Sequence, residues 1–158
     1  MPKLNWFNPI HWLSLGFGTG LAPKAPGTFG TLVGIPFVYL ITQLTWQWQL
    51  IALILATIIG IFLCQYTAKA MGEHDHPSIV WDEIVGYGFA MFALPFEATW
   101  LIAAFLLFRL FDIWKPGPIG WSDKKLTGGT GIMMDDVLAG ILTTAILHIA
   151  AYLSLWAK

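Results

Sequence analysis

The chain has 158 residues, of which 57% are hydrophobic and only 11% are charged, and its formal net charge is −1. Soluble domains carry about 25% charged residues, so this composition argues against a water-soluble globule and favours a multi-pass membrane protein of one domain, residues 1–158. The near-neutral charge offers no basic surface for nucleic acid, and a single cysteine excludes an internal disulfide framework. A soluble helical protein with a very apolar interface is the alternative.

The first thirty residues predict interfacial and loop structure. Aromatic residues in Met1–His11, among them Trp6, suit the membrane interface. Residues 1–20 contain no compact apolar segment followed by a small-residue cleavage site, so no signal peptide is expected. Gly16–Gly30 contains five glycines and two prolines, which favours a loop over a regular helix. Its end, Pro26–Thr28, resembles a helix start whose free N–H groups suit an anion, and a merely flexible loop is the alternative.

Five apolar segments follow, and each predicts a helix. They are Thr31–Leu44, Leu50–Ala68, Ile79–Leu94, Trp100–Trp114 and Gly131–Trp156. The second is the clearest membrane span, because it has nineteen residues without a charge and a span needs about 20. The segments of 14–16 residues rise only about 21–24 Å, so they either extend into the loops or do not cross the bilayer fully. The sequence therefore predicts an all-α integral membrane bundle of about five helices.

The connections between these segments differ in charge. Alternate threading places the glycine-rich loop, Lys69–Ser78 and Lys115–Thr130 on one side of the membrane. It places Thr45–Gln49 and Pro95–Thr99 on the other. The second side receives only Lys158, whereas the first receives Lys3, Lys24, Lys69, Lys115, Lys124 and Lys125. Cytoplasmic loops carry an excess of Lys and Arg, so the first side is predicted to face the cytoplasm.

The same threading gathers acidic residues at the cytoplasmic ends of their helices. They are Asp82, Glu83, Asp112, Asp135 and Asp136. Hard divalent cations such as Mg²⁺ prefer oxygen ligands and usually combine a few carboxylates with substrate phosphate, so this set predicts a metal site. Two alternatives are open. Acids near a helix start complement the helix dipole, and Asp112 forms a purely structural ion pair with Arg109, three residues earlier on the same helix face.

Other polar side chains near these acids suit phosphate binding and proton transfer. Arg109 and Lys115 offer positive charge to a phosphate group. His74 and His76 are interpreted as ligands, as general acid/base groups or as solvated loop residues. The chain lacks the cysteine–arginine spacing, the Asp-x-Asp-x-Thr/Val pattern and the Ser-Gly-His pattern of three phosphatase classes. A metal-assisted route is therefore the one left for phosphate chemistry.

Four sequence blocks carry a resemblance to a known family. They are Ala25–Gly30, His74–His76 with Val80–Glu83, Phe108–Pro116 and Gly128–Asp136. In this order they closely resemble the phosphatidylglycerophosphatase A family, and the resemblance extends roughly from Asn8 to Ala150. It implies an integral protein of the bacterial inner membrane that needs Mg²⁺. The family removes the terminal phosphate from phosphatidylglycerophosphate and leaves phosphatidylglycerol.

The resemblance and the charge pattern together imply a role for each residue. The expected metal ligands are Asp82, Glu83, Asp112, Asp135 and Asp136. The expected phosphate-binding residues are Thr28, Arg109 and Lys115. The expected catalytic residues are Asp82, Glu83, Asp112, Asp136 and His76. A water molecule is the expected nucleophile, and an attacking aspartate is the alternative.

A different class of function is also open, namely a small transporter or channel subunit whose buried acids carry ions. Transporter sites lie near the bilayer midplane, whereas these acids gather toward one face. The expected partners are the lipid substrate and the bilayer, without nucleic acid, and the sequence leaves the oligomeric state open.

Overall fold

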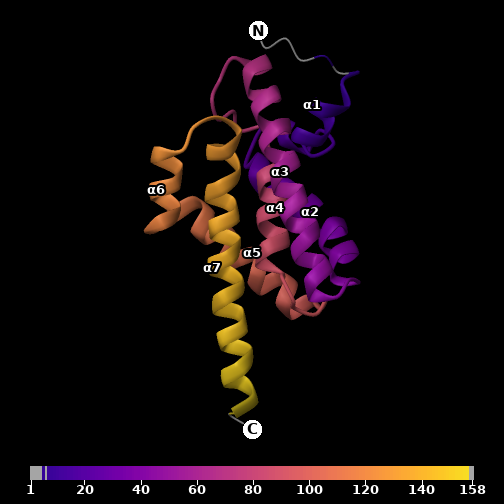
Figure 1. Ribbon diagram of the computed structural model, residues 1–158, viewed down its shortest axis with the longest axis vertical. Helices are drawn as coiled ribbons and strands as arrows, with labels where there is room; N and C mark the ends of the chain where they lie inside the picture. The colour runs from indigo at the N-terminus through magenta and orange to yellow at the C-terminus, as the bar shows by residue number, and fades with distance from the viewer. Residues whose placement is uncertain (1–4, 6, 157–158) are drawn as a thin grey trace.

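A computed structural model describes residue 5 and residues 7–156, and the regular secondary structure of these residues is helical, without a β-strand. The elements are α1 (Pro9–Ser14), the short 3₁₀ helix η1 (Thr19–Leu21), α2 (Pro26–Thr42), α3 (Trp46–Met71), α4 (Trp81–Ala90), α5 (Ala98–Trp114), α6 (Pro118–Lys125) and α7 (Gly128–Trp156). The C-terminal part of α7 extends beyond the other helices and lies at the opposite end of the molecule from α1 (Figure 1). Lys3, Trp6 and Lys158, which entered the predictions above, lie outside the described residues.

Each predicted apolar helix has a counterpart, although several boundaries were wrong. Helix α2 begins at Pro26, so Pro26–Thr28 is indeed a helix start, and the last part of the predicted glycine-rich loop is helical. Proline suits this position because its fixed φ is helical and its missing N–H would have had no partner. Helix α3 begins at Trp46, which makes most of the predicted connection Thr45–Gln49 helical. The predicted polar loop Lys115–Thr130 contains α6.

Two helices, α3 and α7, are long and apolar enough to cross a membrane. Both expose large apolar side chains along their length, including Ile58 and Phe62 on α3 and Ile149 and Leu153 on α7. Such continuous apolar surface is costly in water and favours association with a membrane. Helices α2 and α5 have 17 residues each and rise about 25 Å, which is shorter than the roughly 30 Å hydrocarbon core.

Glycines let α4 and α7 cross at backbone contact, and this crossing positions the acidic residues. A Cβ on Gly140 would overlap the backbone oxygen of Gly86, and a Cβ on Gly86 would lie 2.9 Å from the backbone oxygen of Asp136. Small residues permit this close approach of two helices. Asp82 and Asp136 each precede one of these glycines by four residues, about one helical turn. The crossing therefore brings the two carboxylates to neighbouring positions.

We expect Gly140→Ala to lower the stability of the protein, because the added methyl group would meet rigid backbone of α4. Overpacking of this kind costs about 1–3 kcal/mol. Thermal unfolding in detergent measures the effect, and we expect a Tm several degrees below that of the wild type. Ala150→Leu, at an exposed position of the same helix, is the control and should leave the Tm unchanged. Equal melting temperatures for both variants would contradict the close crossing.

Candidate active site

A cavity of about 290 Å³ lies among the start of α2, the start of α4, the end of α5 and the first turns of α7. All the predicted metal ligands line it, together with Arg109 and Lys115. Its charged lining residues are Asp75, Asp82, Glu83, Arg109, Asp112, Lys115, Asp135 and Asp136. Residues separated by more than fifty positions in the sequence thus meet in one polar cavity of an otherwise apolar protein.

The acids occupy different positions on their helices. Asp82 and Glu83 lie in the first turn of α4, where a carboxylate also complements the helix dipole. Asp135 and Asp136 lie beyond the first turn of α7, so the dipole does not account for them. Both are nevertheless buried, with exposed fractions of 6% and 2%. Buried carboxylates away from a helix terminus need another compensating partner, such as a side-chain cation or a metal ion.

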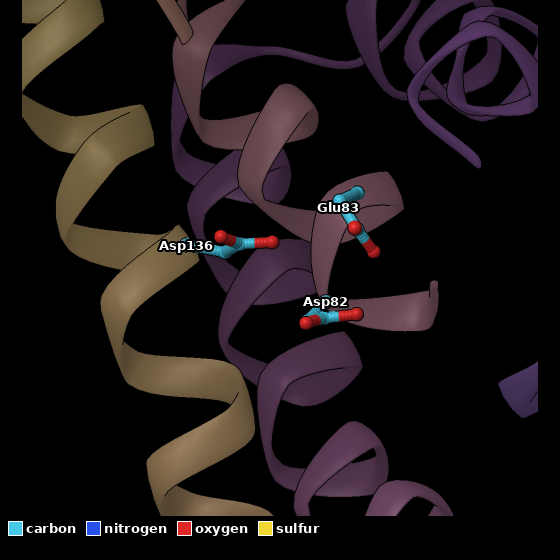
Figure 2. Close-up of side chains that lie close together, drawn as sticks. All are labelled: Asp82, Glu83 and Asp136. Carbon is cyan, nitrogen blue, oxygen red and sulfur yellow. The ribbon is translucent and has the colours of Figure 1, made fainter. Parts of the chain in front are cut away.

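The carboxylates fall into two groups that share one residue. One oxygen each from Asp82, Glu83 and Asp136 lie within 4.8 Å of one another, and the same holds for Asp112, Asp135 and Asp136. Figure 2 shows the first group, in which Asp136 extends from α7 toward Asp82 and Glu83 on α4. Oxygen ligands on opposite sides of a Mg²⁺ ion lie about 4.2 Å apart, so each group is close to the size of a coordination shell.

Buried oxygens without hydrogen bonds support a fit to a divalent cation. Asp82 Oδ1, Glu83 Oε2 and Asp135 Oδ1 have no hydrogen-bond partner among the described residues. A buried acceptor that receives no donor loses its hydration without compensation, at a cost of about 1–3 kcal/mol and more for a charged group. The residues that carry these oxygens line the cavity, where a hard cation would satisfy them. The residues present therefore fit a divalent metal ion.

Arg109 and Lys115 partly neutralise the acids. Arg109 pairs with Asp112, as its spacing predicts, and its Nη1 also lies 3.8 Å from Glu83 Oε1. Lys115 pairs with Asp135 and donates a 2.7 Å hydrogen bond to Asp123 Oδ1. Burial by itself would lower the pKa of the Lys115 ammonium, but its hydrogen bonds to these two carboxylates outweigh burial and raise the pKa. Lys115 is therefore charged throughout the physiological pH range.

The backbone at Lys115 is unusual for a residue with a side chain. It ends α5 with φ 51°, in the left-handed region, which non-glycine residues seldom adopt and which costs roughly 1–2 kcal/mol. The chain reverses here, and the ammonium group reaches across to α7. The residue with the strained backbone is thus the one that forms the ion pair with Asp135, and strained backbone often marks a functional position.

Two of the predicted site residues do not line the cavity. Thr28 lies just beyond Pro26 and Gly27, which do line it. The imidazole of His76 has its Nε2 3.8 Å from Glu73 Oε2, and its Nδ1 accepts a 3.2 Å hydrogen bond from the backbone N–H of Ser78. The phosphate-binding role of Thr28 and the catalytic role of His76 therefore remain predictions.

Several neighbouring residues have structural roles that the sequence did not predict, among them His74, which was interpreted as a ligand, a general acid/base group or a solvated loop residue. A side chain at Gly27 would overlap Glu83 Oε1 and approach Arg109, so this glycine allows the start of α2 to reach the cavity. His74 Nε2 and Gln65 Oε1 accept hydrogen bonds from the backbone N–H groups of Gly128 and Gly129. These contacts cap α7 and hold the helix that carries Asp135 and Asp136. The sequence carried only a general signal for such acceptors, because the first N–H groups of any helix have no partner within the helix.

The described part of the chain is an all-helical fold with two helices that could cross a membrane, and its cavity is a carboxylate-rich candidate metal centre. Residues 12–151 match the sequence model of the family Phosphatidylglycerophosphatase A, and the chain belongs to this family. The family predicted from the four sequence blocks is thereby confirmed. No solved structure matches the chain.

Relatives support the same assignment. The chain is 49% identical over 147 residues to "Phosphatidylglycerophosphatase A" of Escherichia coli K12, covering 92% of this chain and 86% of that protein. It is 47% identical over 154 residues to the Haemophilus influenzae protein of the same name, covering 96% and 94%. A relative from Bacteroides thetaiotaomicron is 37% identical over 148 residues, covering 89% of this chain and 92% of that protein. Its name proposes a phosphatidylinositol-3-phosphatase.

Proposed function

We propose that this protein is a Mg²⁺-dependent phosphatase that hydrolyses phosphatidylglycerophosphate to phosphatidylglycerol and phosphate. The observation that carries the proposal is a cavity in which five buried or half-buried carboxylates lie beside Arg109 and Lys115. The carboxylates are the ligand type that Mg²⁺ prefers, and the two basic side chains suit a phosphate group. Membership of a family named for this activity supports the choice of substrate.

The residues of the cavity have separate proposed tasks. Asp82, Glu83 and Asp136 would hold the cation, which polarises phosphoryl oxygens and lowers the pKa of water when bound. Arg109 presents a planar set of donors that orients the phosphate for attack. Water is the proposed nucleophile: its oxygen bonds to phosphorus and a neighbouring carboxylate accepts its proton. The bond from phosphorus to the glycerol oxygen breaks, and that oxygen takes up a proton to give the alcohol of phosphatidylglycerol.

Phosphate release from purified protein in mixed micelles tests this function. We expect release from phosphatidylglycerophosphate that stops with EDTA and returns with Mg²⁺. Phosphatidylinositol 3-phosphate is the comparison substrate, because the name of one relative proposes it. A transporter or channel subunit would release no phosphate and would instead carry ions into proteoliposomes. Absence of phosphate release at any Mg²⁺ concentration would contradict the proposed function.

We also propose that residues 1–158 form a single domain of the bacterial inner membrane, with α2, α3, α4, α5 and α7 as one bundle. Helix α4 has 10 residues and rises about 15 Å, so it does not cross the bilayer alone. The asymmetry of the lysines supports a cytoplasmic cavity. Asp135 lies seven residues from the start of α7, about 10 Å along the helix, which supports a site near one membrane face.

Cysteine labelling tests this topology. We expect Thr127→Cys and Gln47→Cys, each in a Cys64→Ala background, to react with an impermeant reagent from opposite sides of an intact membrane. Both positions are exposed, whereas Cys64 is buried. The background protein without an added cysteine is the control for unspecific labelling. Reaction of both variants from the same side would contradict the alternating arrangement.

An apolar groove beside the cavity supports a lipid substrate. It has a volume of about 380 Å³ and is lined by the segment that starts at Pro116 and by α7 residues that include Leu138 and Leu142. Pro116 directly follows Lys115 of the cavity. Leu138 and Leu142 lie three and seven residues after Asp135, on the same helix face. We propose that one acyl chain of the substrate occupies this groove while its phosphate lies in the cavity.

Leu142→Trp, which fills the groove, is expected to raise the KM for a long-chain substrate by about 10-fold and to leave kcat nearly unchanged. The KM for a short-chain analogue should not change, because that analogue does not reach the groove. Leu153→Trp, at an exposed position of the same helix, is the matched control. An equal effect on both substrates would show that the groove does not hold the acyl chain.

A further inference from the structure

The negative charge of the carboxylates in the cavity exceeds the positive charge of its basic side chains and one divalent cation together. Five buried or half-buried carboxylates face only Arg109 and Lys115 among its lining residues, which leaves three formal negative charges when all groups are ionised. Asp75 also lines the cavity but is exposed to solvent. One divalent cation would leave a net negative cavity that repels a phosphate dianion. A second would bring the five buried or half-buried carboxylates, the two basic side chains and the cations to a formal charge of +1, which suits that dianion.

The carboxylates also have the arrangement that two cations need. Asp136 belongs to both candidate groups, one with Asp82 and Glu83 and the other with Asp112 and Asp135. Each group contains a residue that lines the cavity, is more than nine-tenths buried and has an unpartnered oxygen. This oxygen is Asp82 Oδ1 in the first group and Asp135 Oδ1 in the second. These oxygens are independent signs that a ligand belongs in each group, because neither has a donor among the described residues.

We infer that the cavity binds two divalent cations, and that Asp136 contributes to both sites. This inference rests on the proposed phosphatase function and deepens it. Paired metal ions in phosphatases lie about 3.5–4 Å apart and stabilise the attacking and leaving oxygens of a phosphoryl transfer. A carboxylate shared between two adjacent groups suits such a pair.

Lys115 occupies the place of a cation in the second group. Its ammonium group contacts one oxygen of Asp135 and leaves the other without a partner. The same ammonium also bonds Asp123, which lies outside both groups. Lys115 would therefore keep its contact with Asp123 if a metal ion replaced the ammonium group at Asp135. Its ammonium competes with the second cation, and removal of the ammonium strengthens binding at that site.

Manganese binding tests the inference, because Mn²⁺ substitutes for Mg²⁺ and is visible in electron paramagnetic resonance spectra. We expect the purified full-length protein in detergent to bind two Mn²⁺ per chain, with a spin-coupled spectrum. Asp82→Asn and Asp135→Asn should each retain one magnetically isolated ion, and Asp136→Asn should abolish the coupling. Lys115→Met should bind the second Mn²⁺ at least about 10-fold more tightly, which corresponds to 1.4 kcal/mol. Glu97→Gln, at an exposed acid on α5's N-cap, is the control and should bind two coupled ions.

One Mn²⁺ per wild-type chain, or two ions without spin coupling, would overturn the two-cation inference whatever the variants do. Two coupled ions in Asp135→Asn would overturn it as well, because the second group would then not be the site. Phosphate release together with a single bound ion would leave the proposed function intact and remove only this inference. Two coupled ions in a protein that releases no lipid phosphate would support the inference and contradict the proposed function. Circular dichroism of each variant checks that the helical fold is retained.

Discussion

Asp82→Asn and Asp136→Asn are each expected to reduce Mg²⁺-dependent phosphate release by at least about 100-fold while the protein stays folded. Loss of a residue that merely orients a metal ligand costs about 10–100-fold, and loss of a ligand itself should cost no less. Asparagine keeps the shape of the side chain but removes the charge that holds the cation. Because Asp82 Oδ1 is buried without a partner, a neutral amide there should not destabilise the metal-free protein and should raise its Tm if anything.

Two measurements check this prediction. Phosphate release is followed as Mg²⁺ is titrated, and thermal unfolding is recorded in EDTA. Glu97→Gln changes an exposed acid at the start of α5 in the same way and should behave as the wild type. If both aspartate variants turned over substrate at nearly the normal rate at limiting Mg²⁺, these residues would not be the ligands.

The double change of Arg109→Met with Asp112→Leu is expected to restore folding but not catalysis. Each single change leaves a charge of the pair without its partner. For a fully buried pair this costs about 3–5 kcal/mol, and we expect less here because the side chains are 16% and 14% exposed. Arg109 also lies near Glu83, so Arg109→Met should be the more destabilising single change. Removing both charges should recover part of the lost stability.

The catalytic readout separates a structural pair from a functional one. If Asp112 holds metal and Arg109 orients phosphate, the double variant folds and releases little phosphate. Leu110→Met with Ile113→Leu repeats the same spacing at exposed apolar positions of α5 and is the matched control. A double variant of Arg109 and Asp112 with a rate near that of the wild type would show that the pair serves only the fold, and would remove both residues from the proposed site.

Local sequence patterns determined those features that depend on one segment at a time. Apolar runs identified the helices, and composition indicated membrane association, because both follow from how a single segment partitions between water and an apolar phase. The pair of Arg109 and Asp112 was predictable, since residues three apart on a helix are neighbours wherever the helix lies. The acids were identified as a set because a charge inside an apolar segment is costly in any fold. Helix boundaries were predicted less well. Pro26–Thr28 was recognised as a helix start, but apolar content did not mark Trp46 as the start of α3.

The tertiary structure decided how these pieces meet. The grouping of the acids around Asp136 depends on the contact of α4 with α7 at Gly86 and Gly140, and no local pattern says which helices pack together. The pairing of Lys115 with Asp135 depends on a left-handed turn at the end of α5. The positions of Thr28 and His76 outside the cavity lining likewise follow from packing between segments. Contacts between distant segments are set by the shapes that fit together, so only the folded chain determines which of the acids lie close enough to share a cation.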